Sequence, residues 1–121
     1  MPKRETVEEF VALVEAGAFD RAMERFYAED ASMQENQDPP RQGLEALVEG
    51  ERRTMARSRN ITARCVRPIL IEGDTVAIRW LFAFEFSDGR SIVLDEIAHQ
   101  RWTGEKMREE KFFYDPKQMG R

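Results

Sequence analysis

The chain has 121 residues, of which 41% are hydrophobic and 35% are charged, with a net charge of −4. These values predict one soluble domain over residues 1–121, with its core at about 6–116, and they argue against a nucleic-acid partner. A single cysteine, Cys65, excludes an internal disulfide, and one cysteine with one histidine argues against a His/Cys zinc site. No apolar run approaches the roughly 20 residues of a membrane span, and the polar start lacks a secretory signal, so we expect a cytoplasmic protein.

Two short amphipathic helices are expected first. Thr6 and Glu9 have the spacing of a capping box, and Gly17 is typical of a left-handed helix end. The apolar residues that follow Thr6 recur at helical spacing, and a second stripe of the same kind comes after the glycine. The two stripes are Val7, Phe10, Val11 and Val14, and Phe19, Ala22, Met23 and Phe26. They predict a helical hairpin.

A short strand and a third helix come next. Residues 31–37 fit a short edge strand, and Asp38-Pro39-Pro40 then interrupts regular structure. Gly43 precedes a helix whose apolar face is Leu44, Leu47, Val48 and Met55. Its last turns and the residues after them are rich in arginine, which fits a solvated helix end; an anion-binding or nucleic-acid-binding patch is the alternative.

The rest of the chain predicts four long strands. They run over 61–71, 75–86, 91–102 and 106–114, and Pro68 marks a bulge or an edge in the first. Asp88-Gly89 predicts a two-residue type I′ hairpin turn. The expected fold is therefore α+β: a curved antiparallel sheet of about four long strands plus a short edge strand, packed on three N-terminal helices.

The order of these elements carries a family resemblance, together with several short segments. The segments are Phe26-Tyr27-Ala28-Glu29-Asp30-Ala31, Gly43, Asp88-Gly89, Gln100-Arg101-Trp102 and Phe113-Tyr114-Asp115-Pro116. Over residues 6–116 the chain resembles the nuclear transport factor 2-like (cystatin-like) superfamily, and within it the SnoaL-like branch of ketosteroid isomerases and polyketide cyclases. The resemblance implies a cone-shaped sheet around a pocket, and a homodimer through the sheet's outer face. It does not specify a reaction.

The hairpin turn also predicts a register. If Ser87 lies opposite Arg90, Arg79 and Leu81 share a face with Glu96. The aromatic residues of 75–86 then lie on the other face, with Asp95 and His99. That face needs a cover of helices or of a partner subunit, and its aromatic stripe fits core, interface or a lipid-like ligand site.

Three positions compare directly with ketosteroid isomerase. The resemblance places Glu35 at the position of that enzyme's general base. Phe10 stands where the isomerase has an oxyanion-binding tyrosine, and Ala98 where it has a protonated aspartate. Because both hydrogen-bond donors are absent, a developing enolate would have no obvious partner, and we do not expect steroid isomerase activity.

The resemblance and the register together define a candidate site. Glu35 and Glu96 are candidate acid–base groups, and Arg79 and Tyr114 are candidate polarising groups. Ligand contacts are expected from Phe10, Leu81, Leu94, Gln100, Trp102, Glu110 and Phe112. An alternative for the charged residues is a Glu–Arg network that only fixes strand register.

The functional expectation follows from this site. We expect a cavity for a small, partly apolar organic ligand, without metal or cofactor. Acid–base catalysis of isomerase, cyclase or hydrolase type is one possibility, and a non-catalytic ligand-binding or dimerisation module of the same fold is the alternative.

Overall fold

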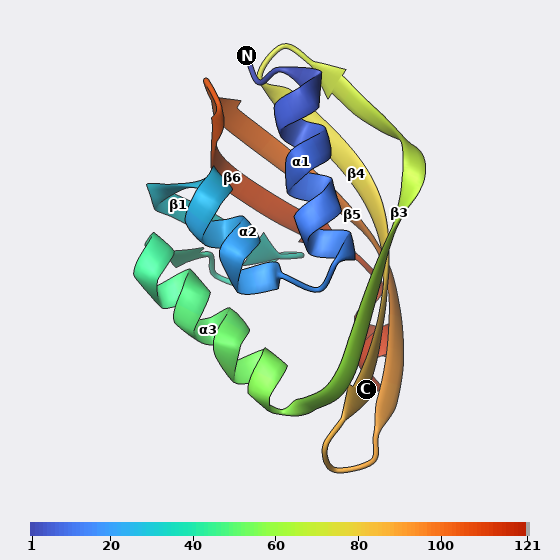
Figure 1. Cartoon of the computed structure of the whole chain (residues 1–121). Coiled ribbons are helices and arrows are strands. Elements are labelled where there is room, and N and C mark those ends of the chain that lie inside the picture. The colour runs from blue at the N-terminus through green and yellow to red at the C-terminus, as the bar shows by residue number, and fades with distance from the viewer. Residues whose placement is uncertain (121) are drawn as a thin grey trace.

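A strongly curved sheet wraps around three helices in the computed structural model, which describes residues 1–120 (Figure 1). The helices are α1 (Arg4–Glu15), α2 (Phe19–Phe26) and α3 (Leu44–Ala56). The strands are β1 (Tyr27–Glu35), β2 (Arg41–Gln42), β3 (Ser58–Glu72), β4 (Thr75–Phe86), β5 (Ser91–Thr103) and β6 (Lys106–Phe113), and a single 3-10 turn, η1 (Pro116–Met119), follows. Within residues 1–120, no helix has the length and apolar character to cross a membrane.

The six strands form one sheet in the order β2-β1-β6-β5-β4-β3. The α+β class and the three helices against a curved sheet are as expected. The sheet is mixed rather than wholly antiparallel, because β1 runs parallel to β6. The strand expected at 31–37 is present over residues 31–35 as part of β1, but its expected edge position is wrong, because β1 pairs with β6 on one side and with the two-residue β2 on the other. The turn and the two prolines after Glu35 let the chain fold back as β2 and cover that edge.

The first helix starts two residues before the expected capping box. The carbonyl oxygen of Lys3 accepts hydrogen bonds from the Thr6 and Val7 amides at 3.0 and 3.2 Å, so Lys3 is the N-cap and Thr6 lies inside the first turn. Glu9 instead forms an ion pair with Arg25 of α2 at 2.7 Å. The expected end is confirmed, because Gly17 follows the helix with a φ of 82°.

Both apolar stripes of the helical hairpin are buried, as the 3.6-residue period predicts. They fill the concave side of the sheet together with residues of β4, β5 and β6. Trp80, Ile78 and Met107 are the largest fully buried apolar side chains of these strands. The helices therefore supply the cover that the aromatic face of β4 needs.

The β4–β5 hairpin differs from the expected register by one residue. The amide of Phe86 donates to the carbonyl of Arg90 at 2.8 Å, so the loop has three residues, Ser87–Gly89. A type I′ turn needs a positive φ at both central residues, whereas Asp88 has none and Gly89 has a φ of 92°. A three-residue loop with glycine in the left-handed region forms instead.

This slip moves one strand relative to the other and changes which side chains share a face. Trp80 lies opposite Glu96, and Ile78 lies opposite Ala98. The concave face therefore combines the aromatic stripe of β4 with the cavity residues expected on β5. Arg79 and Leu81, which were expected on the cavity face, lie on the convex face.

The long strand β3 forms the far edge of the sheet. Its pairing with β4 is interrupted between Val66 and Leu70, at the segment that contains Pro68. Both the bulge and the edge position indicated by this proline are therefore present, because proline has no amide hydrogen to donate to a neighbouring strand.

A pair of alanine substitutions tests the two faces. Ile78 is 1% exposed on β4, and Val93 is 60% exposed on the opposite face of β5. We expect Ile78→Ala to lower the free energy of unfolding by about 2–5 kcal/mol, because it leaves a cavity in the core. Val93→Ala should cost less than about 1 kcal/mol. Urea unfolding followed by circular dichroism measures both, and equal losses would contradict the face assignment.

Candidate functional site

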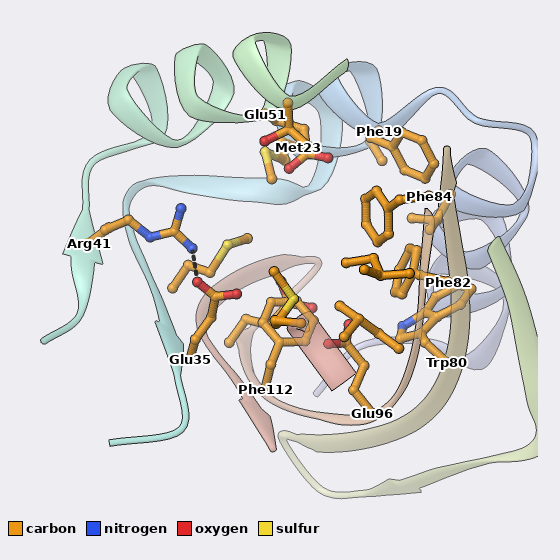
Figure 2. Close-up of a pocket in the computed structure, with 18 of the residues that line it drawn as sticks. Phe19, Met23, Glu35, Arg41, Glu51, Trp80, Phe82, Phe84, Glu96 and Phe112 are labelled. Atoms are coloured by element: carbon orange, nitrogen blue, oxygen red, sulfur yellow. Dashed lines mark ion pairs between the residues drawn. The ribbon is translucent and has the colours of Figure 1, made fainter. Parts of the chain in front are cut away.

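A cavity of about 360 Å³ lies between the helices and the concave face of the sheet. This volume is at the lower end of the ~300–1,000 Å³ typical of small-molecule sites. One wall is aromatic and comes mainly from β4, as Figure 2 shows. The aromatic residues that line the cavity are Phe10, Phe19, Tyr27, Trp80, Phe82, Phe84, Phe86 and Phe112.

Four carboxyl groups line the same cavity. Glu35, Glu110 and Glu96 come from the three neighbouring strands β1, β6 and β5, and Glu51 comes from α3 above them (Figure 2). Strand pairing places them together, since Glu110 lies opposite Gln100 on β5 and Met33 on β1. Residues two apart on a strand share a face, so Glu96 and Gln100 both point inward, as do Met33 and Glu35.

Glu96 is the most isolated of the four acids. It is 6% exposed, and no residue within 1–120 forms a hydrogen bond or an ion pair with its carboxyl group. Burial raises the pKa of Glu96 to about 8, and the negative charges of Glu110, Glu35 and Glu51 add to the effect. A carboxyl group with this pKa holds its proton at pH 7 and can exchange it close to neutrality.

Glu110 is equally buried but fully partnered. Its carboxylate accepts a hydrogen bond from the hydroxyl of Tyr27 and one from Nε2 of Gln100 at 2.7 Å. The Gln100 carbonyl in turn accepts from Nε1 of Trp102 at 3.1 Å. Burial raises the pKa of Glu110 to about 7, although the two hydrogen bonds act in the opposite direction. Burial beside Glu110 also raises the pKa of Tyr27 well above its usual value.

Glu35 lies nearer the solvent than the other strand acids. Its carboxylate accepts a hydrogen bond from the hydroxyl of Tyr114 at 3.1 Å, and it pairs with the guanidinium of Arg41 at 3.5 Å. Desolvation and the neighbouring Glu35 raise the pKa of Tyr114 to about 12. The sequence-based grouping of Glu35 with Tyr114 thus corresponds to a direct contact, and Arg41 is a partner that the sequence analysis missed.

Glu51 is the acid that the sequence analysis missed. It extends from α3 toward the cavity, and burial raises its pKa, while Arg41 acts in the opposite direction. The sequence does contain a sign of this acid, because position 51 falls on the apolar stripe of the helix, between Val48 and Met55. A charged residue at such a position indicates a polar pocket below the helix.

The arginines at the end of α3 divide between two roles. Arg52 pairs with Asp20 and Glu24 of α2, at 3.2 and 3.3 Å. Arg57, by contrast, is exposed and borders the cavity.

The remaining candidates fall into three groups. Phe10, Leu94, Glu110 and Phe112 line the cavity, and their contact with a ligand stays a prediction. Gln100 and Trp102 do not line it but lie behind the wall, where they hold Glu110. Arg79 and Leu81 are on the convex face, and Arg79 forms a two-pronged ion pair with Asp95 at 2.7 and 2.9 Å. The expectation that Arg79 polarises a ligand is therefore wrong, because the register slip turns its side chain away from the cavity.

The polar groups that line the site are carboxyl, hydroxyl and guanidinium groups, and the side-chain amide of Gln100 lies behind them. In the described part of the chain, no three His, Cys, Asp or Glu side chains are arranged to hold a metal ion. The arrangement provides two buried carboxyl groups with pKa values near neutrality against an apolar wall, which is the chemistry of proton transfer.

Comparison with known proteins agrees with this architecture. Residues 7–110 match the family model of the SnoaL-like domain. Among proteins with curated descriptions, none matches the chain.

Solved structures share the fold at low sequence identity. A candidate SnoaL-like polyketide cyclase from Mesorhizobium loti is 22% identical, with a TM-score of 0.77 over 92% of this chain and 97% of that chain. A nuclear transport factor 2-like protein of unknown function from Burkholderia pseudomallei is 12% identical, with a TM-score of 0.80 over 96% and 92%. A protein from Catenulispora acidiphila with a ketosteroid isomerase-like fold, in complex with trimethylamine, is 19% identical, with a TM-score of 0.75 over 88% and 85%.

The raised pKa values predict how stability depends on pH. Folded Glu96 and Glu110 keep protons up to about pH 8 and 7, whereas the unfolded chain releases them near 4.5. The folded state therefore binds more protons in this window, and the free energy of unfolding should fall as pH rises from about 5 to 9. Each pKa unit between the folded and unfolded states corresponds to about 1.4 kcal/mol. Glu96 should therefore lower the free energy of unfolding by a few kcal/mol across this pH range. Urea unfolding measured across this range tests the slope.

A matched pair of variants assigns the effect to Glu96. Glu96→Gln removes the titrating group while keeping its shape, so its stability should vary less with pH and exceed that of the wild type at pH 9. Glu109→Gln, on the exposed side of β6, should keep the wild-type slope. The same pH slope in all three proteins would mean that Glu96 does not carry a raised pKa.

Removal of the Tyr27 hydroxyl tests the buried network. Tyr27→Phe leaves the Glu110 carboxylate with one donor fewer, so we expect a loss of about 1–3 kcal/mol at pH 8. The loss should be smaller at pH 5, where a protonated Glu110 no longer needs two donors. Chemical denaturation at the two pH values measures the difference, and a loss independent of pH would assign the effect to packing alone.

Proposed function

The chain belongs to the SnoaL-like domain family, and we propose that it binds a small, partly apolar organic molecule and transfers a proton to or from it without a cofactor. Glu96 is the proposed proton carrier. The reaction class is isomerisation, cyclisation or hydrolysis, each of which needs a group that both gives and takes a proton.

The observation that carries this proposal is the unpartnered, nearly buried carboxyl group of Glu96 on the cavity surface. A buried acid held by structural partners would have its lone pairs occupied. The atoms of Glu96 are free to meet a ligand, and a pKa of about 8 suits proton exchange near neutral pH.

The other polar groups have supporting roles in the proposal. Burial is the main cause of the high pKa of Glu96, and Glu110, held nearby by Tyr27 and Gln100, raises that pKa further when it is ionised. Glu35 lies farther toward the Arg41 side of the cavity, where it can contact a polar end of the ligand, and Tyr114, which does not line the cavity, holds Glu35 by a hydrogen bond. The aromatic wall of β4 excludes water from the apolar part of the ligand.

A non-catalytic ligand-binding module is the second candidate. The full hydrogen bonding of Glu110 and the pairing of Glu35 with Arg41 favour it, because both acids then serve structure rather than chemistry.

The homodimer through the convex face stays a prediction, and sedimentation at micromolar concentration tests it.

Proton exchange at carbon tests the proposed chemistry directly. We would incubate a panel of small cyclic and aryl ketones with the protein in deuterium oxide and follow loss of the α-proton signals by NMR. Exchange should exceed the buffer rate for at least one ketone and should rise through an apparent pKa near 8, as Glu96 loses its proton. Glu96→Gln should reduce the enzymatic rate by about 10²-fold or more.

Two controls separate the candidate functions. Glu109→Gln, on the outside of the sheet, should leave exchange unchanged. If a ketone binds, as judged by tryptophan fluorescence, but no exchange occurs, the binding module is correct and catalysis by Glu96 is not.

A further inference from the structure

We propose that the natural ligand carries a protonated amine, bound in the part of the cavity that is lined by Glu96, Glu51 and the aromatic wall of β4. This inference rests on the proposed function, because it concerns the same cavity, and it specifies the chemical class of the ligand. It depends on the charge, the contacts and the shape of the site.

The carboxyl groups of the cavity outnumber the cationic groups that line it. Four carboxyl groups line it, but only two guanidinium groups, those of Arg41 and Arg57. Arg41 is committed to Glu35 at 3.5 Å, and Arg57 is exposed at the edge of the cavity. The inner part therefore has carboxyl groups without a cationic partner, and a cationic ligand beside them would favour their ionised form.

The two acids that face the inner space have no partner of their own. Within residues 1–120, neither Glu96 nor Glu51 takes part in a hydrogen bond or an ion pair through its side chain. Figure 2 shows Glu51 extending from α3 and Glu96 from the sheet toward the same space. An ammonium group has three N–H donors and no acceptor, so it can donate to the unpartnered carboxyl group of either residue.

The apolar wall beside these acids also suits a cation. Trp80, Phe82 and Phe84 form a continuous series of rings, with centroids 5.5 Å apart for the first pair and 6.1 Å apart for the second. Indole and phenyl faces attract a cation within about 6 Å. A neutral ligand could accept one hydrogen bond from protonated Glu96, whereas an amine uses the wall together with ionised carboxyl groups.

The rest of the cavity sets the shape of the ligand. Beyond the acids the lining is hydrophobic, with Phe19, Met23 and Leu94 among its residues. A primary or secondary amine with an apolar ring or chain would satisfy both regions. A carboxylate or phosphate ligand would instead meet Glu51 and Glu96 with like charge.

Three probes of similar size test the charge of the ligand: 2-phenylethylamine, 2-phenylethanol and 3-phenylpropanoate. We would measure their binding by isothermal titration calorimetry at pH 7. The amine should bind about tenfold more tightly than the alcohol, and the carboxylate should bind most weakly.

Proton release gives a readout that packing alone cannot produce. Glu96 is mainly protonated at pH 7 in the free protein, and an ammonium group beside it favours the ionised form. Calorimetry in two buffers of different ionisation enthalpy should show release of up to about one proton per amine. Glu35, Glu110 and Tyr27 also face this region, so the assignment to Glu96 needs variants.

The variants locate the binding group. Glu96→Gln should weaken amine binding about tenfold, abolish most of the proton release and leave alcohol binding nearly unchanged. Glu51→Gln should weaken amine binding as well, with proton release retained from Glu96. Glu109→Gln is the outside control, and circular dichroism verifies that each variant folds.

The outcomes separate this inference from the proposed function. If the amine binds most tightly and its proton release is lost in Glu96→Gln, the result supports both the amine proposal and the ligand-binding function. Equal or tighter binding of the alcohol overturns the amine proposal but leaves the cavity as a ligand site. If none of the three probes binds, the amine proposal is overturned, and the proposed function then depends on the ketone assay alone.

Discussion

The carboxyl group of Glu96 lies on the concave face of the sheet, where no hydrogen bond or ion pair from residues 1–120 offsets the desolvation of its charged form. Buried carboxyl groups are normally paired, since an unpaired buried charge is strongly unfavourable. Here the acid responds by keeping its proton. Two other features of the site keep Glu96 protonated. The apolar wall excludes water from its carboxyl group, and the neighbouring acids disfavour its negative charge.

The topology of the sheet brings the acids together. The parallel pairing of β1 with β6 places Glu35 and Glu110 on neighbouring strands, and β5 adds Glu96 beside them. The helices then enclose this region and contribute Glu51 from above (Figure 2). A carboxyl cluster of this kind could not form on the convex face, where water would screen the charges and the acids would ionise independently.

Local patterns were sufficient to predict most of the fold. The bounds of β4 follow directly from its β-branched and aromatic residues, and the stripes of α1 and α2 from their spacing. The register of the β4–β5 hairpin was wrong because Asp88-Gly89 suits both a two-residue and a three-residue loop. That choice depends on how the strands pack against the helices, which adjacent residues do not encode.

Only part of the candidate site was predicted, because the rest depends on contacts between elements that are distant in sequence. Glu35, Glu96 and Glu110 were found because a resemblance to known proteins aligned whole strands. Arg79 was misplaced by the register, and Glu51 was missed because contacts between α3 and the sheet join residues far apart in sequence. A charged residue on an otherwise apolar helical stripe is the signal that would have found Glu51.

The protonation state of Glu96 is the central claim, and carbon-13 NMR of protein labelled at the glutamate side-chain carboxyl carbons measures it directly. The resonance absent from Glu96→Gln identifies the group. Our account predicts that this resonance titrates with a midpoint near pH 8. A midpoint near 4.5, the value of an ordinary glutamate, would contradict it.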